Sequence, residues 1–244
     1  MRVSKKNRRK GILLAALTLL FSVGGVSAYM TDQEAAANEF TVGDLDFNLY
    51  ETAWDGELPD GTYIATPSSA MGIEQARNIV PGQVIPKDPA IRNNSRNDAY
   101  LRVRVKIPVE DAVLADGEGN LLNGGAPTET ELFSYEENAG TGMRLTADSP
   151  TVEVDTATAS NASGASRYHV YEYMYTGGGE EEIPLPAGQD IPPLFDEVVF
   201  ANLADSSLNG TVEWIHVDFR AIQSAGFASS EDAWNAYDRQ NPQG

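Results

Sequence analysis

The chain of 244 residues contains no cysteine, so no disulfide can stabilise it and no cysteine can act as a nucleophile. It has only two histidines, His169 and His216, and neither has a glutamate at the helical spacing of a zinc peptidase motif. A G-x-S-x-G elbow is also absent. The sequence therefore predicts no catalytic residue, no metal ligand and no cofactor. A zinc site between strands, built from both histidines and a carboxylate, stays open as an alternative.

A calcium loop is the other metal site to consider. Asp116, Glu118 and Asn120 alternate oxygen ligands as such a loop does. Leu121 stands where the loop requires glycine, and no glutamate closes it at the twelfth position. These departures favour a solvated turn.

Basic residues are scarce outside the first ten positions. The first 28 residues begin with a basic stretch, which is followed by an apolar run at 12–21 and by the small residues Val26-Ser27-Ala28. This order is typical of a secretory signal peptide. We predict a signal peptide at 1–28 with cleavage between Ala28 and Tyr29. A permanent membrane anchor is the alternative, but a span needs roughly 20 apolar residues and Gly24 and Gly25 interrupt this shorter run.

Cleavage would make the chain strongly acidic. All six leader charges are basic, so 11 of the 17 Lys and Arg would remain against 36 Asp and Glu, a formal charge of about −25. Such a polyanion repels nucleic acid and anionic membranes, so we expect neither as a partner and no stable membrane anchor after cleavage. The 216 residues after position 28 are enough for one sizeable domain.

Apolar residues alternate with polar ones in several segments. In Leu101–Ile107 every second residue is apolar and the others are basic, which predicts a strand with one buried face. Residues 45–49 and 215–220 alternate in the same way, and Tyr168–Tyr175 is a further expected strand. Clusters of Pro, Gly, Asn and Asp separate these runs. We predict a mainly β fold, an antiparallel β-sandwich at 29–228.

Two other regions complete the expected organisation. Residues 110–165 are rich in small and acidic residues, and we interpret them as long, variable surface loops with one strand near Thr151–Val154. Residues 229–244 are expected to form a short C-terminal helix and tail, with Ser229 as N-cap and Asp232 at the third helical position. The tyrosines of 168–175 could form an exposed aromatic face for carbohydrate or protein, although core packing explains most of them.

Several motifs in order resemble the TasA and camelysin (CalY) family. The first is Ala28–Asp32 followed by Asn38–Asp46. Further similar stretches are Val80–Pro89, Ile91–Asn93, Asn97–Val103, Pro193–Asp196 and Ala221–Phe227. The resemblance implies a jelly-roll sandwich, export through a signal peptidase of SipW type in Gram-positive bacteria, and a place in the extracellular biofilm matrix or at the cell surface. Residues 110–165 do not match the family.

The same resemblance implies a structural function. Family members build matrix fibres, so the expected partners are further copies of this chain and other matrix proteins. Assembly would proceed by strand donation from Tyr29–Phe40, with side chains such as Tyr29, Met30 and Phe40 in pockets of the next subunit. The alternative is that this segment is the frayed or helical start of a monomer. A cell-surface adhesin that uses the 110–165 loops and a camelysin-type metallopeptidase are the alternative functions.

Overall fold

The computed structural model describes residues 31–34, 45–52, 79–154, 167–204 and 215–242. The predicted cleavage site Ala28–Tyr29 and the predicted donor residues Met30 and Phe40 lie outside these ranges. The described residues are mainly in antiparallel strands, which confirms the predicted fold class. The jelly-roll connectivity stays a prediction.

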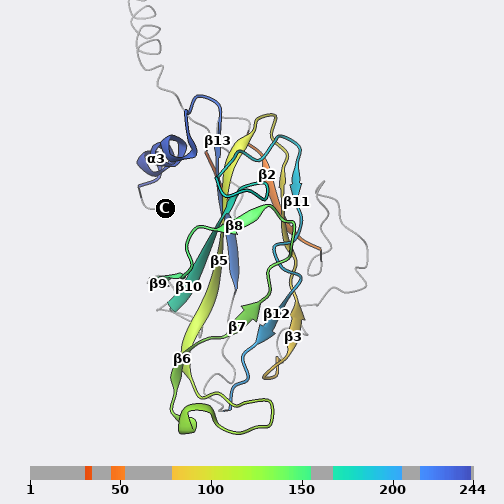
Figure 1. The fold of residues 1–244 in the computed structure, drawn as a ribbon, viewed down its shortest axis with the longest axis vertical. Coiled ribbons are helices and arrows are strands. Elements are labelled where there is room, and N and C mark those ends of the chain that lie inside the picture. Colours follow the sequence, from red (N-terminus) through yellow and green to blue (C-terminus); the bar gives the residue numbers. More distant parts are fainter. Residues whose placement is uncertain (1–30, 35–44, 53–78, 155–166, 205–214, 243–244) are drawn as a thin grey trace, which may run out of the picture.

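A seven-stranded antiparallel sheet forms one layer of the fold (Figure 1). Its main order is β1-β13-β5-β10-β8, while β6 also pairs with β5 and β9 with β10. The long strand β5 lies between β13 and β10, and the alternation of apolar and basic residues at Leu101–Ile107 gives it one buried face. The strands are β1 (Thr31–Glu34), β5 (Ala99–Ala112), β6 (Thr128–Glu131), β8 (Met143–Leu145), β9 (Thr151–Val154), β10 (Arg167–Tyr175) and β13 (His216–Gln223).

Two three-stranded sheets form the second layer. Figure 1 shows them one above the other along the long axis, facing the seven-stranded sheet. One has the order β11-β4-β2 and the other β3-β12-β7. Their strands are β2 (Phe47–Glu51), β3 (Val84–Pro86), β4 (Pro89–Asn93), β7 (Phe133–Tyr135), β11 (Asp190–Ile191) and β12 (Glu197–Phe200).

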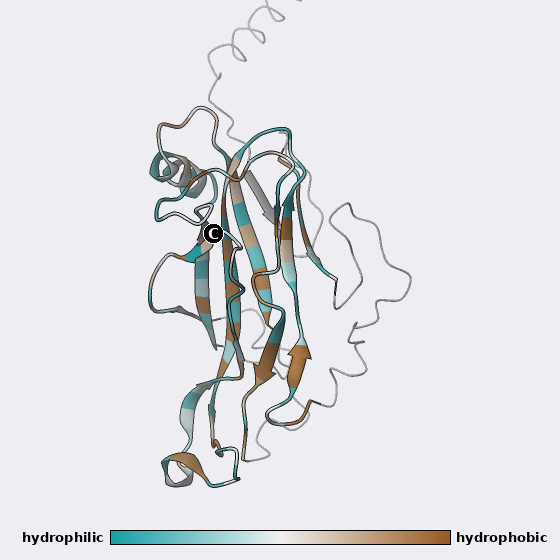
Figure 2. Ribbon diagram, turned by 45° about the vertical axis from the view of Figure 1, so that its right-hand side comes forward, coloured by the Kyte–Doolittle hydropathy of each residue, from teal (hydrophilic) through white to brown (hydrophobic). Residues whose placement is uncertain are grey.

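The hydrophobic core lies between these two layers. Leu101, Val103 and Val105 of β5 are buried there, and Figure 2 shows apolar and polar residues alternating along the long strands. The ring of Phe47 on β2 meets that of Phe219 on β13 at 5.6 Å between centroids. Burial of these side chains is the main stabilising contribution that a disulfide-free chain can make.

The turn between Val80 and Gln83 forms as its sequence predicts. Gln83 N–H donates to Val80 O at 3.0 Å, and Gly82 has a φ of +76°. A type II turn requires a positive φ at its third position, which Gly82 supplies, and proline is common at its second position. The turn leads into β3 and so shapes one corner of the sandwich.

Residues 110–165 contain more regular structure than predicted. The strand at Thr151–Val154 is confirmed as β9, but β6, β7 and β8 also lie in this segment, together with a 3₁₀ turn at Leu122–Gly125. Leu132 and Phe133 are buried in the main core, so part of the segment belongs to the body of the fold. Strands of three or four residues are too short to show a clear period of two, which is why the composition alone pointed to loops.

Helix α3 (Ser230–Gln240) covers one end of the outer face of the seven-stranded sheet. Ser229 is its N-cap as predicted, since the Ser229 hydroxyl accepts the N–H of Asp232 at 3.1 Å. Trp234 and Tyr237 of the helix pack against Tyr100 and Ile222 of the sheet. Among the described residues, no helix has the length and apolar character needed to cross a membrane.

Candidate functional site at the sheet edge

Strand β1 forms one edge of the seven-stranded sheet. Its four residues pair antiparallel with β13, so that Thr31 lies opposite Ile222 and Glu34 opposite Phe219. The other side of β13 pairs with β5 along its whole length, from His216 to Gln223. Part of the predicted donor segment is therefore a strand that pairs with the body of its own chain. The predicted alternative of a helical start is wrong for Thr31–Glu34.

The register assigns the residues of β13 to two faces. Partners in an antiparallel pair lie on the same face of the sheet. Phe219 and Ala221 lie opposite Val103 and Leu101, so they face the core and are fully buried. Asp218, Arg220 and Ile222 lie opposite Arg104, Arg102 and Tyr100 on the outer face. Strand β13, which pairs with β1, thus packs between the two layers with its inner face and carries charged side chains on its outer face.

Basic side chains of β5 and β13 form ion pairs across the outer face. Arg104 Nη2 and Lys106 Nζ donate to the two carboxylate oxygens of Glu153 at 2.6 and 3.1 Å. Burial raises the pKa of the Glu153 carboxyl, but the hydrogen bonds and positive charges of Lys106 and Arg104 outweigh burial and lower it. Arg220 donates to Glu172, which also lies 3.5 Å from Arg102. The alternation of basic residues in β5 was visible in the sequence, whereas these acidic partners come from other strands.

Glu182 links helix α3 to the sheet. Its carboxylate accepts Nε and Nη2 of Arg102 at 3.1 and 3.0 Å, and also Nε1 of Trp234 at 2.7 Å. The guanidinium of Arg102 lies 4.7 Å from the centre of the Trp234 ring. The side chain of Glu182 is only 5% exposed, so these contacts are charge-assisted bonds shielded from water. They hold α3 against the outer face next to β13.

Tyrosines of β7 and β10 form a hydroxyl network on the inner face. The hydroxyls of Tyr135 and Tyr173 lie 2.8 Å apart, and Tyr173 also donates to Glu137 at 2.8 Å. Tyr171 donates to Glu131 at 2.6 Å. Burial is the main reason that the pKa of each of these three tyrosines is raised above its usual value. Tyr173 and Tyr175 are buried in the main core, and Tyr168 is buried in a separate small cluster with Val170, so packing accounts for most of the predicted aromatic face.

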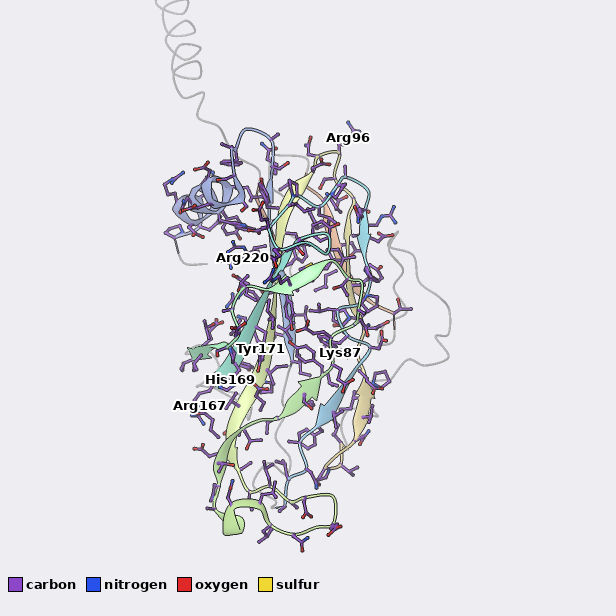
Figure 3. All side chains as sticks on the ribbon, in the orientation of Figure 1. Lys87, Arg96, Arg167, His169, Tyr171 and Arg220 are labelled. Atoms are coloured by element: carbon purple, nitrogen blue, oxygen red, sulfur yellow. The ribbon has the colours of Figure 1, made fainter. Side chains whose placement is uncertain are left out.

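The two histidines lie on opposite faces of the sheet. His169 is opposite Ile107, on the inner face, whereas His216 is opposite Lys106, on the outer face. His169 Nδ1 lies 2.7 Å from Glu131, and Figure 3 shows His169 along β10 between Arg167 and Tyr171. A zinc site that uses both histidines is therefore contradicted by the geometry. Within the part of the chain that the structure describes, no group of three or more His, Asp or Glu side chains is placed to hold a metal ion.

The carboxylate of Asp116 organises its own turn. Asp116 Oδ1 accepts the backbone N–H groups of Glu118 and Asn120, each at 2.9 Å. Oδ2 accepts Nδ2 of Asn120 at 3.0 Å, and this hydrogen bond is the main reason that the pKa of Asp116 is lowered. Both oxygens are thus engaged by N–H donors, which favours the solvated turn over a calcium loop.

Sequence reasoning missed the strand that pairs with β1. It predicted a donor segment at Tyr29–Phe40 from a resemblance, but it named no strand of this chain with which that segment would pair. Burial of Phe219 and Ala221 was implied by the alternation at 215–220, yet only the register shows that β1 pairs with this strand. Nothing in the sequence spacing links Glu182 to Trp234.

A family model described as "Camelysin metallo-endopeptidase" matches residues 3–118. The match confirms the predicted resemblance to this family over the N-terminal part of the chain. It extends through residues 110–118, so the expectation that 110–165 departs from the family is wrong for these nine residues. No curated protein and no solved structure matches the chain.

Proposed function

Since residues 3–118 are camelysin-like in sequence, we propose that the chain is a secreted structural protein of the extracellular matrix or cell surface. In this proposal its subunits form fibres by donating the N-terminal segment to the next copy. Signal peptidase cleavage after Ala28 would free that segment, so assembly would start only after export.

The observation that carries the proposal is the pairing of β1 with β13. Residues Thr31–Glu34 of the segment are already an extended strand, and this four-residue ladder lies at the edge of the sheet. If β1 of one copy replaced β1 of another, the same backbone hydrogen bonds and register would form between chains. Such an exchange changes little in contact energy, because an equivalent set of bonds is lost and gained.

The same geometry gives a reason for the exchange to end in a filament. Without β1, the groups of Phe219–Ile222 that pair with it would form an open edge, and an open edge binds another strand readily. Each copy would then have one strand, β1, to donate and one open edge, on β13, with which a donated strand can pair. A head-to-tail contact of this kind produces open fibres unless its rotation closes a ring.

Two forms of the mature protein test the role of the segment. We expect the form that starts at Tyr29 to build filaments under suitable conditions and the form that starts at Thr41 to remain unassembled, because it lacks β1. Electron microscopy and sedimentation measure the difference. Equal polymerisation of the two forms would show that another edge carries assembly.

A pair of cysteine variants tests whether the strand moves between chains. Asp32 lies opposite Ala221, and the native chain has no cysteine to interfere. When Asp32→Cys and Ala221→Cys proteins are mixed under oxidising conditions, we expect disulfide-linked dimers on non-reducing gels. Gln223→Cys, two residues out of register, is the matched control and should link far less. A chain that carries both Asp32→Cys and Ala221→Cys provides the comparison. If it forms the disulfide within itself while the mixed single variants form no dimer, β1 stays permanently on its own chain.

We further propose that the protein acts without peptidase chemistry, although the matching family model is described as a metallo-endopeptidase. His169 and His216 cannot share a metal across the sheet, and Glu131 engages His169. We expect the purified mature protein to retain no stoichiometric zinc and to leave casein uncleaved. Elemental analysis and a protease assay measure this. Stoichiometric zinc or cleavage that His169→Ala abolishes would contradict the proposal.

A further inference from the structure

The outer face of the seven-stranded sheet contains a hollow of about 280 Å³. Strands β8 and β9 pair with the two ends of β10, at Tyr173–Tyr175 and Arg167–Val170, and the residues that join β8 to β9 border the hollow. Its polar lining comes from the four strands β5, β9, β10 and β13 and from this connection, and consists of Arg104, Glu172, Arg220, Thr146, Ser149 and Thr151.

The charged side chains of the hollow are held in place before any ligand arrives. Arg104 is paired with Glu153, and Arg220 with Glu172. The Arg220 guanidinium also lies 5.9 Å from the ring centres of both Trp234 and Tyr237. Figure 3 shows Arg220 near the middle of the sheet. Side chains fixed in this way lose little conformational entropy when they bind a ligand.

The hollow also has hydrogen-bonding capacity to spare. The carboxylate of Glu172 has about four lone-pair sites and can accept more bonds than its arginines supply. Thr146, Ser149 and Thr151 add hydroxyls that can both donate and accept.

We propose that this hollow binds one residue of a neutral polysaccharide. A sugar hydroxyl both donates and accepts, so it can bond to a carboxylate, a guanidinium and a threonine or serine at once. Ala147 and Val170 offer a small apolar surface to the C–H groups of the ring. The volume is at the small end of ligand sites, which suits a single ring better than a large ligand.

Charge argues against an anion in the same place. Each guanidinium of the hollow already faces a carboxylate, Glu153 for Arg104 and Glu172 for Arg220. The chain as a whole carries a formal charge of −19 and would repel an anion from solution. A neutral polyhydroxyl ligand gains charge-assisted bonds without this penalty.

Isothermal titration calorimetry on the secreted protein tests the proposal. The probes are cellohexaose, maltohexaose and chitohexaose, with glucuronate and inorganic phosphate as anionic comparisons. We expect saturable binding of at least one neutral oligosaccharide. Ser149→Ala and Thr151→Val should each weaken that binding about fivefold, since each removes one hydrogen-bonding hydroxyl.

Ser134→Ala on β7 is the matched control, because it removes an exposed hydroxyl from the other layer and should leave binding unchanged. Arg220→Lys should weaken binding about tenfold or more, and thermal unfolding separates this loss from a loss of fold. Three outcomes would overturn the proposal: no neutral oligosaccharide binds, the anions bind in preference, or binding survives the Ser149 and Thr151 variants unchanged. The site is independent of strand donation, so each proposal can fail alone.

Discussion

The free energy of unfolding is expected to fall steeply once the pH passes about 10. Burial raises the pKa of Tyr135, Tyr171 and Tyr173 above the usual value of 10.0. In the unfolded chain these tyrosines lose their protons near pH 10, whereas in the folded chain they keep them. Their contribution to stability is therefore fully present below pH 10 and is lost as the pH rises further.

The size of this effect follows from the number of protons retained. Each tyrosine that stays neutral in the fold costs about 1.4 kcal/mol of stability per pH unit above 10. For Tyr135 and Tyr173 together, the expected loss of unfolding free energy is about 3 kcal/mol per pH unit. Screening by solvent reduces this value. Against a typical total of about 5–15 kcal/mol, this loss should unfold the protein within a few pH units.

Urea unfolding at a series of pH values, with tyrosinate absorbance followed in parallel, measures the slope. Tyr173→Phe is the informative variant, because it removes one proton from the balance and should make the slope shallower by about 1.4 kcal/mol per pH unit. At neutral pH it should cost only about 1 kcal/mol, since Tyr135 and Glu137 each lose one hydrogen-bond partner. Full tyrosinate formation near pH 10 with the fold intact would contradict the burial argument.

Phe219→Ala is expected to destabilise the chain by about 3–5 kcal/mol. Phe219 is fully buried on β13, and its ring meets Phe47 of the opposite layer. Truncation would leave a cavity where the two layers join and where β1 pairs with the same strand. Urea denaturation at neutral pH measures the loss.

Phe200→Ala is the matched control for this substitution. Phe200 contacts Phe133 at 5.3 Å between ring centres but is only partly buried, so its truncation should cost clearly less. Equal losses for the two variants would mean that β13 is no more central to the core than β12. A loss below about 1 kcal/mol for Phe219→Ala would mean that the site can collapse around the missing ring.

Local patterns alone determined the long strands and the helix start. β5 and β13 were predicted because an apolar residue recurs at every second position and one face must leave water, and β10 because its segment is rich in tyrosine. The Ser229 cap and the Pro81-Gly82 turn were predicted because each depends on the conformational preferences of two or three adjacent residues. These features need no distant partner, so the sequence was enough.

Only the tertiary structure decided which segments meet. The pairing of β1 with β13, the placement of the two histidines on opposite faces, and the contact of Glu182 with Trp234 all join residues far apart in the chain. Register sets these contacts, and a shift of one residue would move every side chain to the other face. The hollow beside Arg220 arises in the same way, from four strands and a connection whose composition had indicated only a loop. Period and composition describe a strand by itself, whereas a site requires the identity of its neighbours.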